Sequence, residues 1–199
     1  MKKTYNQVYQ FKITLRDSKP PIWRRIQVPE TYSFWDLHVA IQDAMGWDDY
    51  HLHSFDMINP HNGYKESIGI PDDDSMWSTD TKAGWKMKIA DYFTLDGNDK
   101  ADYTYDFGDN WEHLIKLEKI LPREKSVKYP VCVKGKRACP PEDCGGIWGY
   151  MDLLEILSDP NHREYKSWLE WLGGEIDPDD FDAKNVIFDD PAKRLKNAF

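Results

Sequence analysis

The sequence predicts an α+β domain, with a β-grasp-like mixed sheet, one helix packed on the sheet and a C-terminal helical layer. Three observations support this class: alternating apolar residues near the N-terminus, a helical apolar stripe after Ser33, and two further helical stripes after Gly149. The 199 residues fit one domain. We expect a sheet-rich part at about 8–130, a Cys, Pro and Gly-rich loop at 131–149, and a helical part at 150–195.

The N-terminal region predicts two strands, separated by a turn that ends at Pro20-Pro21. Apolar and polar residues alternate in the first strand, whose inward residues are Tyr9, Phe11, Ile13 and Leu15. The second strand has one apolar phase, formed by Ile22, Ile26 and Val28. Arg24 falls in this phase, and a buried arginine needs a carboxylate or carbonyl partner. The alternative is a twisted strand in which Trp23 faces inwards.

A helix and a third strand follow these two strands. Ser33 and Asp36 resemble a capping box, and Gly46 is placed to end the helix. The apolar face of the helix consists of Phe34, Leu37, Ile41, Ala44 and Met45. The alternation from His51 to Met57 is typical of a strand, and it places His51 and His53 on one face of that strand.

The central and C-terminal regions predict a hairpin, two more strands and several helices. Residues 58–86 are mostly polar, and Asn62-Gly63 within them indicates a short hairpin. Two strands flank a tight turn: Ala101 to Phe107, Gly108-Asp109-Asn110, and Glu112 to Ile120. Helical segments are expected at Ile89 to Phe93, along Tyr150, Leu153, Leu154 and Leu157, along Tyr165, Trp168, Leu169 and Leu172, and at Pro178 to Phe181 and Ala192 to Leu195.

The charge and hydropathy patterns limit the partners. A net charge of −9 disfavours nucleic acid, whose binding depends on neutralising phosphates. Eight Lys or Arg residues at 116–137 nevertheless form a basic strip, which a solvated strand and loop also explain. No apolar run approaches the roughly 18 residues of a membrane helix, and no apolar signal core follows the N-terminus, so we expect a cytoplasmic protein without a membrane partner.

Several sequence motifs stand in a fixed order: PPIWRRIQVP at 20–29, HLHSF at 51–55, YDFGDNWEH at 105–113, YPVC at 129–132, GKRACPPEDCGGIWGY at 135–150, and FD at 181–182. This set resembles the Ri-plasmid ORF-3-like family, also known as the insertion-element passenger TnpR family. The resemblance runs from about Tyr9 to Phe188. It implies an α+β fold and an association with plasmids and other mobile elements, and it implies no activity, cofactor or set of site residues.

Three cysteines, Cys132, Cys139 and Cys144, lie in the Cys, Pro and Gly-rich segment. Structural zinc binds four nitrogen or sulfur ligands, so a histidine would have to complete the set. The candidates are His113, His51 and His53. No paired C-x₂-C sequence supports zinc. The alternatives are small buried residues in a rigid loop, and redox-active thiols whose pKa nearby basic side chains would lower.

Two further groups of polar residues are candidate sites. Asp106, Asp109 and His113 surround a tight turn and would form a carboxylate–imidazole set for general acid–base catalysis. In the structural alternative, Asp109 satisfies backbone groups of the turn and Asp106 pairs with an inward arginine. Glu142 and Asp143 precede the flexible Gly145-Gly146 pair. These two carboxylates would hold a cation, pair with Arg24, Arg25 or Arg137, or cap the helix that starts near Gly149.

The sequence lacks the patterns of P-loop, dinucleotide-binding, zinc-protease and serine-hydrolase sites. The leading hypothesis is therefore a non-enzymatic binding or accessory domain associated with mobile elements. Its surface would consist of Trp111, Trp148 and the loop 132–150, and its partner would be a protein or peptide. One alternative is an enzyme or zinc-binding protein that uses the cysteine loop with a nearby histidine. The other is a nucleic-acid accessory protein that uses the strip 116–137.

Overall fold

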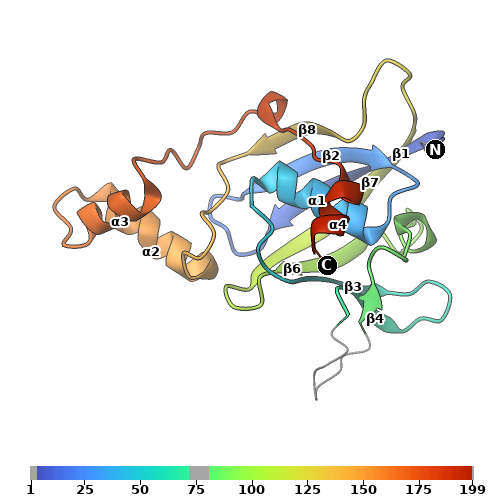
Figure 1. Cartoon of the computed structure of the whole chain (residues 1–199), viewed down its shortest axis with the longest axis horizontal. Helices are drawn as coiled ribbons and strands as arrows, with labels where there is room; N and C mark the ends of the chain where they lie inside the picture. Colours follow the sequence, from blue (N-terminus) through green and yellow to red (C-terminus); the bar gives the residue numbers. More distant parts are fainter. Residues whose placement is uncertain (1–3, 72–80, 199) are drawn as a thin grey trace.

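The computed structural model describes residues 4–71 and 81–198. Its centre is a mixed eight-stranded sheet with the strand order β5-β4-β3-β6-β7-β1-β2-β8 (Figure 1). The strands are β1 (Gln7–Leu15), β2 (Trp23–Pro29), β3 (His53–Ile58), β4 (Lys65–Gly69), β5 (Lys82–Ala83), β6 (Lys100–Tyr105), β7 (Trp111–Pro122) and β8 (Val131–Lys136). The α+β class and the mixed sheet are thus confirmed, while the finer likeness to a β-grasp sheet stays a prediction.

In chain order, one α-helix follows the second strand and the other three follow the last strand. They are α1 (Phe34–Met45), α2 (Gly146–Ser158), α3 (Tyr165–Leu172) and α4 (Pro191–Ala198), with short 3₁₀ helices η1 (Ile89–Asp91) and η2 (Ala183–Asn185). They do not form one layer. Helix α4 packs on α1 over the sheet, whereas α2 and α3 lie together beyond one end of the strands (Figure 1). Only the first half of α2 contributes buried residues, and α3 contributes none.

Strand β1 shows why one face of the sheet holds the core. Its residues Phe11 and Ile13 are fully buried on the side covered by α1, while Lys12 between them is only half-buried on the other side. Strands β2 and β7 flank β1 on both sides in antiparallel register. The predicted alternation of apolar and polar residues therefore has its expected cause, a sheet with one buried apolar face and one polar face.

Helix α1 begins and ends where the sequence predicts. The Ser33 side chain accepts a hydrogen bond from the Asp36 N–H group, and the Asp36 carboxylate accepts one from the Ser33 N–H group. This is a complete capping box, which satisfies two backbone donors at the helix start. Gly46 ends the helix at φ 100°, a left-handed conformation that suits glycine.

Arg24 is buried on the core face of β2, and the twisted-strand alternative with Trp23 inwards is wrong. Its guanidinium donates to three backbone carbonyls, with Nε 2.7 Å from the Ala44 oxygen and Nη1 3.0 and 3.2 Å from the Trp23 and Lys136 oxygens. The Phe181 ring covers the guanidinium at 3.7 Å from its centroid. Carbonyl dipoles and a ring face together replace the carboxylate that a buried arginine otherwise requires.

The structure corrects two strand boundaries. β3 starts at His53, so His51 lies before the strand and does not share a strand face with His53. β8 occupies 131–136, which the sequence assigned to a loop, and it pairs with β2 at the sheet edge. The hairpin at Asn62-Gly63 is confirmed by the antiparallel pairing of β3 with β4. Part of the polar stretch 58–86 lies outside the described residues.

The helices of this chain are short. Within residues 4–71 and 81–198, none is both long and apolar enough to cross a bilayer. The longest, α2, has 13 residues, fewer than the roughly 20 that a span requires.

Candidate functional site

Three segments meet at one end of the sheet, where β3 begins, β6 ends and β7 begins. We call this region the loop end and define it as residues 48–52, 106–110 and 139–146. Its first contact joins the end of α1 to the Cys, Pro and Gly-rich segment. The indole Nε1 of Trp47 donates to the Pro140 carbonyl at 3.0 Å.

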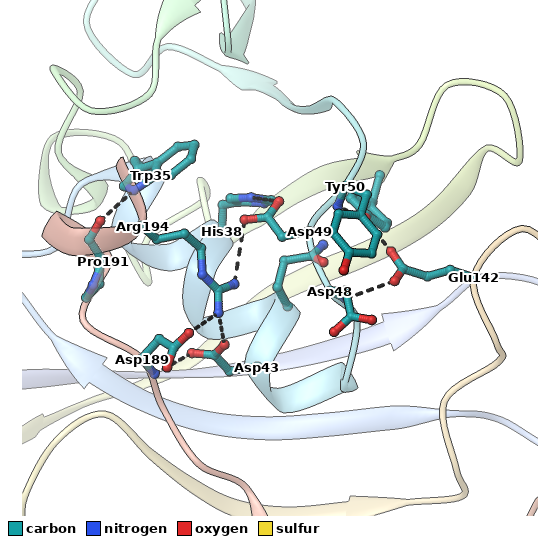
Figure 2. A network of polar contacts seen from close by, with 12 residues as sticks. Trp35, His38, Asp43, Asp48, Asp49, Tyr50, Glu142, Asp189, Pro191 and Arg194 are labelled. Carbon is teal, nitrogen blue, oxygen red and sulfur yellow. Dashed lines mark hydrogen bonds and ion pairs between the residues drawn. The ribbon is translucent and has the colours of Figure 1, made fainter. Parts of the chain in front are cut away.

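Glu142 holds the loop end together through its carboxylate. One oxygen accepts a short hydrogen bond from the Tyr105 hydroxyl, and the other accepts the Asp48 N–H at 2.9 Å (Figure 2). The Tyr105 oxygen in turn accepts the Tyr50 N–H at 3.0 Å. Burial and the Glu142 carboxylate raise the pKa of Tyr105, so the phenol keeps the proton that it donates. Glu142 therefore neither pairs with an arginine nor caps a helix among the described contacts.

Gly145 and Gly146 let the same segment dock on the turn at 106–110. Both have positive φ, 91° and 68°, and a Cβ atom on Gly146 would overlap the carbonyl oxygen of Asp109. The Gly145 N–H donates to the Asp109 carboxylate at 3.2 Å. Gly145 is the N-cap of α2 and has no side-chain capping bond, so Asp143 does not cap this helix. Close backbone approach explains why glycines stand here.

His51, Asp106 and Asp143 meet between these docked segments. The His51 Nε2 atom lies 3.2 Å from a carboxylate oxygen of Asp143 and 3.7 Å from one of Asp106. One potential ligand atom from each of the three residues lies within 4.8 Å of the other two. The other Asp106 oxygen accepts the Gly108 N–H at 2.9 Å. Asp106 thus satisfies the turn backbone, and the expected ion pair with an inward arginine is replaced by contact with His51.

The predicted acid–base set of Asp106, Asp109 and His113 is not brought together. His113 is fully buried on the core face, where its ring contacts Trp47 and its Nδ1 atom bonds to the Trp111 carbonyl at 2.9 Å. Burial lowers the pKa of His113 to about 4. Among the described residues no hydrogen bond or ion pair joins it to either aspartate. A sealed imidazole of this kind packs as a core residue and has no access to a substrate.

The core also contains a stacked pair of buried histidines, His38 and His53, which the sequence did not predict. His38 is fully buried on α1 and connects the Tyr103 hydroxyl, 2.9 Å from its Nδ1, with the Asp49 carboxylate, 2.8 Å from its Nε2. The buried His53 ring stacks on the His38 ring. Burial lowers the pKa of both histidines well below the usual value. His53 is therefore a core residue, and it does not join His51 as a metal ligand.

Arg194 of α4 closes this network from the C-terminal side (Figure 2). Its guanidinium lies 2.6 Å from the Asp43 and Asp189 carboxylates and 3.6 Å from Asp49. The Trp35 indole also donates to the Pro191 carbonyl at 3.0 Å. The spacing of Phe34, His38 and Ile41 on one helical face could have indicated a buried histidine, but no local signal links it to Arg194.

The three cysteines are free thiols on the core side of the same segment. Cys132 and Cys144 are buried and Cys139 is half-buried. Burial raises the pKa of all three thiols, to about 12 for Cys144. They do not belong to the three-residue ligand group found among the described residues. The buried thiols therefore hold their protons, which disfavours redox chemistry because that chemistry requires the thiolate.

The remaining candidates divide between core and surface. Trp111 is buried against Trp47, so it is not part of a recognition surface, whereas Trp148 is exposed in the first turn of α2. Arg25 forms a bidentate ion pair with Glu118 on the open sheet face, at 2.6 and 2.8 Å. The basic strip runs along β7, the loop after it and β8, and in the sheet β1 and β2 separate the two strands. Within the strip, Arg137 is paired with Asp179 at 3.0 Å.

Comparison with known proteins identifies the family of this chain. The family model described as plasmid pRiA4b ORF-3-like protein matches residues 7–185. The chain belongs to this family. It is 35% identical over 181 residues to the uncharacterized protein y4hQ from Sinorhizobium fredii, a match that covers 91% of this chain and 87% of the relative.

A solved structure of similar sequence supports the fold. The chain is 51% identical to the protein of unknown function MM3350 from Methanosarcina mazei Go1, with a TM-score of 0.86. The match covers 93% of this chain and all of that chain. Both relatives are described as uncharacterized or of unknown function, so membership in the ORF-3-like family carries the fold and no activity.

Proposed function

We propose that this member of the ORF-3-like family is a non-enzymatic binding domain whose loop end binds a peptide segment of a protein partner. One observation carries the proposal: large hydrophobic side chains are exposed in two segments of the loop end and in the helix turn that directly follows the third. Tyr50 is 78%, Leu52 50%, Phe107 56% and Trp148 71% exposed. Tyr50 and Leu52 flank His51, Phe107 follows Asp106, and Trp148 stands in the first turn of α2. Clustered exposed aromatics are typical of protein-binding surfaces.

The charge around these side chains favours a basic peptide. Asp17, Asp48 and Asp143 are exposed and Asp109 is half-buried near the aromatic residues. Asp17, Asp109 and Trp148 also line one cavity of about 150 Å³. A partner with Lys or Arg beside an aromatic or aliphatic residue complements this combination of carboxylates and rings. This surface replaces the sequence-based one, because Trp111 belongs to the core.

The enzyme alternative has less support. Catalysis needs an acid or base within reach of a substrate, and the buried His113 is sealed behind Trp47. The nucleic-acid alternative rests on the basic strip, whose members at Lys116 and Arg137 face Asp99 and Asp179 across 3.8 and 3.0 Å. We retain the association with mobile elements and the cytoplasmic location as parts of the proposal, motivated by the family resemblance and the sequence.

A phage-displayed library of random peptides tests the proposal. We expect wild-type protein to enrich peptides that combine Lys or Arg with an aromatic residue. Fluorescence polarisation with the enriched peptides should show at least about tenfold weaker binding to Trp148→Ala and to Phe107→Ser, because each truncation removes a contact residue. The matched control is Tyr64→Ser, an exposed aromatic residue at the opposite end of β3.

Two outcomes would contradict this function. One is an absence of enriched peptides with folded wild-type protein. The other is equal binding of the enriched peptides to wild type and to both loop-end variants. The assay is run in chelator, so that a metal ion at Asp143 does not compete with a basic side chain. Raising the salt concentration should weaken binding, since exposed carboxylates supply part of the attraction.

A further inference from the structure

We infer that His51, Asp106 and Asp143 form a binding site for one divalent transition-metal ion, with Zn²⁺ as the best match. The three residues come from three different segments of the loop end and converge on one point. This site differs from the cysteine-based zinc site that the sequence suggested. The inference does not depend on the proposed peptide binding, because it rests on ligand atoms and not on exposed aromatic rings, although the two sites share Asp143.

The distances between the ligand atoms fit a metal ion. Ions of this class hold nitrogen and oxygen ligands at about 2.0–2.2 Å, which places neighbouring ligands of a tetrahedron or octahedron about 2.8–3.6 Å apart. The His51 Nε2 atom lies 3.2 Å from Asp143 and 3.7 Å from Asp106. The His51–Asp143 distance already matches this range, and the Asp106 oxygen would move slightly closer on coordination.

The His51 Nε2 atom provides an independent indication of a ligand. This atom is shielded from solvent and forms no hydrogen bond among the described residues, although it lies within ion-pair distance of both carboxylates. It nevertheless points between two carboxylates. A buried polar atom without a hydrogen bond is costly, and coordination of a cation by its lone pair would remove that cost.

The surroundings orient the Asp106 carboxylate and hold the backbone on either side of Asp143. One Asp106 oxygen accepts the Gly108 N–H, which leaves the oxygen near His51 free to coordinate. Asp143 lies between Glu142, which is bonded to Asp48 and Tyr105, and Gly145, which is bonded to Asp109. Hydrogen bonds of this kind orient the first ligands of a metal site and raise its affinity.

The ligand types select the class of ion. One imidazole nitrogen with two carboxylates suits Zn²⁺, Mn²⁺ or Fe²⁺, whereas Ca²⁺ and Mg²⁺ favour oxygen ligands alone. Three protein ligands leave at least one position for water or for an acceptor group of a partner. The half-buried His51 and the exposed Asp143 leave this side accessible.

Isothermal titration of chelator-treated, untagged protein with Zn²⁺ tests the site. We expect one ion per chain in wild type and at least about tenfold weaker binding in His51→Ala, in Asp106→Asn and in Asp143→Asn. The matched controls are His61→Ala and Asp96→Asn, which change exposed residues of the same types outside the loop end. Circular dichroism verifies that each variant is folded.

A Co²⁺ spectrum separates this site from the cysteines. Nitrogen and oxygen ligands give weak visible bands, whereas thiolate ligands add intense sulfur-to-metal charge-transfer absorption in the near ultraviolet. We expect no such absorption. The inference is overturned by any of three results: no Zn²⁺ bound by wild type, unchanged affinity in the His51 and Asp106 variants, or a thiolate band. None of these results depends on peptide binding.

Discussion

The imidazole ring of His38 on α1 is stacked on that of His53 on β3, with 3.4 Å between the ring centroids and 8° between the ring planes. Both rings are buried, and neither nitrogen of His53 has a hydrogen-bond partner among the described residues. The Asp49 carboxylate lies next to the His38 ring, and the Arg194 guanidinium lies next to Asp49. Two cations cannot share such a stack, so the core of this domain is built for two neutral histidines.

The first prediction is a loss of stability in mild acid. The pKa of His38 and of His53 is lowered in the folded state, mainly by burial. In the unfolded chain the pKa of a histidine is about 6.5. Below that pH the unfolded chain takes up protons that the folded chain does not. The free energy of unfolding is therefore highest above that pH and falls as the pH decreases. We expect each histidine to contribute a loss of about 1.4 kcal/mol between pH 7.5 and 5.5.

Urea unfolding of wild type and of His53→Leu at the two pH values measures this effect. The apolar replacement leaves no polar partner unsatisfied, so the variant should fold and should show a pH dependence smaller by about 1.4 kcal/mol. His61→Gln, in the exposed hairpin, is the matched control and should keep the wild-type dependence. Equal pH dependence in His53→Leu and wild type would show that the buried pair is not the cause.

Local signals in the sequence predicted much of the fold. The alternation in β1 and the Ser33–Asp36 capping box each depend on neighbouring residues, and both are seen in the structure. β8 was missed because the segment VCVKGK lies at a sheet edge and has no clear alternation of apolar residues. The C-terminal helices were predicted as segments, but the docking of α4 on α1 depends on Arg194 and on Asp43, 151 residues away.

The sequence indicated the residues of the candidate site but not that these residues meet. His51, Asp106 and Asp143 all stood among the sequence candidates, each grouped with different partners. Their convergence depends on Glu142 and Gly146, which dock one loop on two others through long-range contacts. His38 was missed because it meets His53 only when helix and strand pack together. Spacing along the chain carries no information on such contacts.

The second prediction concerns Arg24. Replacement by Ala removes the hydrogen bonds from Arg24 to the carbonyls of Ala44, Trp23 and Lys136, and it removes the guanidinium from the Phe181 ring. We expect a loss of roughly 3 kcal/mol in the free energy of unfolding. Arg25→Ala is the control one residue away, and its partly exposed ion pair should contribute about 1 kcal/mol or less. Similar losses in both variants would contradict the special role of Arg24.

The third prediction is that the native thiols react slowly. A thiol reacts as its thiolate, and burial raises the pKa of Cys132, Cys139 and Cys144. With the disulfide reagent dithiobis(nitrobenzoate) at pH 8, the folded protein should react at least about 100-fold more slowly than the same protein in guanidinium chloride. Rapid reaction of one thiol in the folded chain would restore the redox hypothesis for this segment.

The fourth prediction tests the docking of the Cys, Pro and Gly-rich segment on the turn. Gly146→Ala places a Cβ atom on the Asp109 carbonyl, at a positive φ that side chains disfavour. Gly173→Ala has a similar φ of 75° with open space around the new atom, so it measures the conformational cost alone. We expect Gly173→Ala to cost about 1 kcal/mol and Gly146→Ala at least about 2 kcal/mol more. Because the clash also moves Asp143 away from His51, Gly146→Ala should weaken Zn²⁺ binding, while Gly173→Ala should leave it unchanged. Equal stability and equal metal affinity in the two variants would mean that this close approach does not position the site.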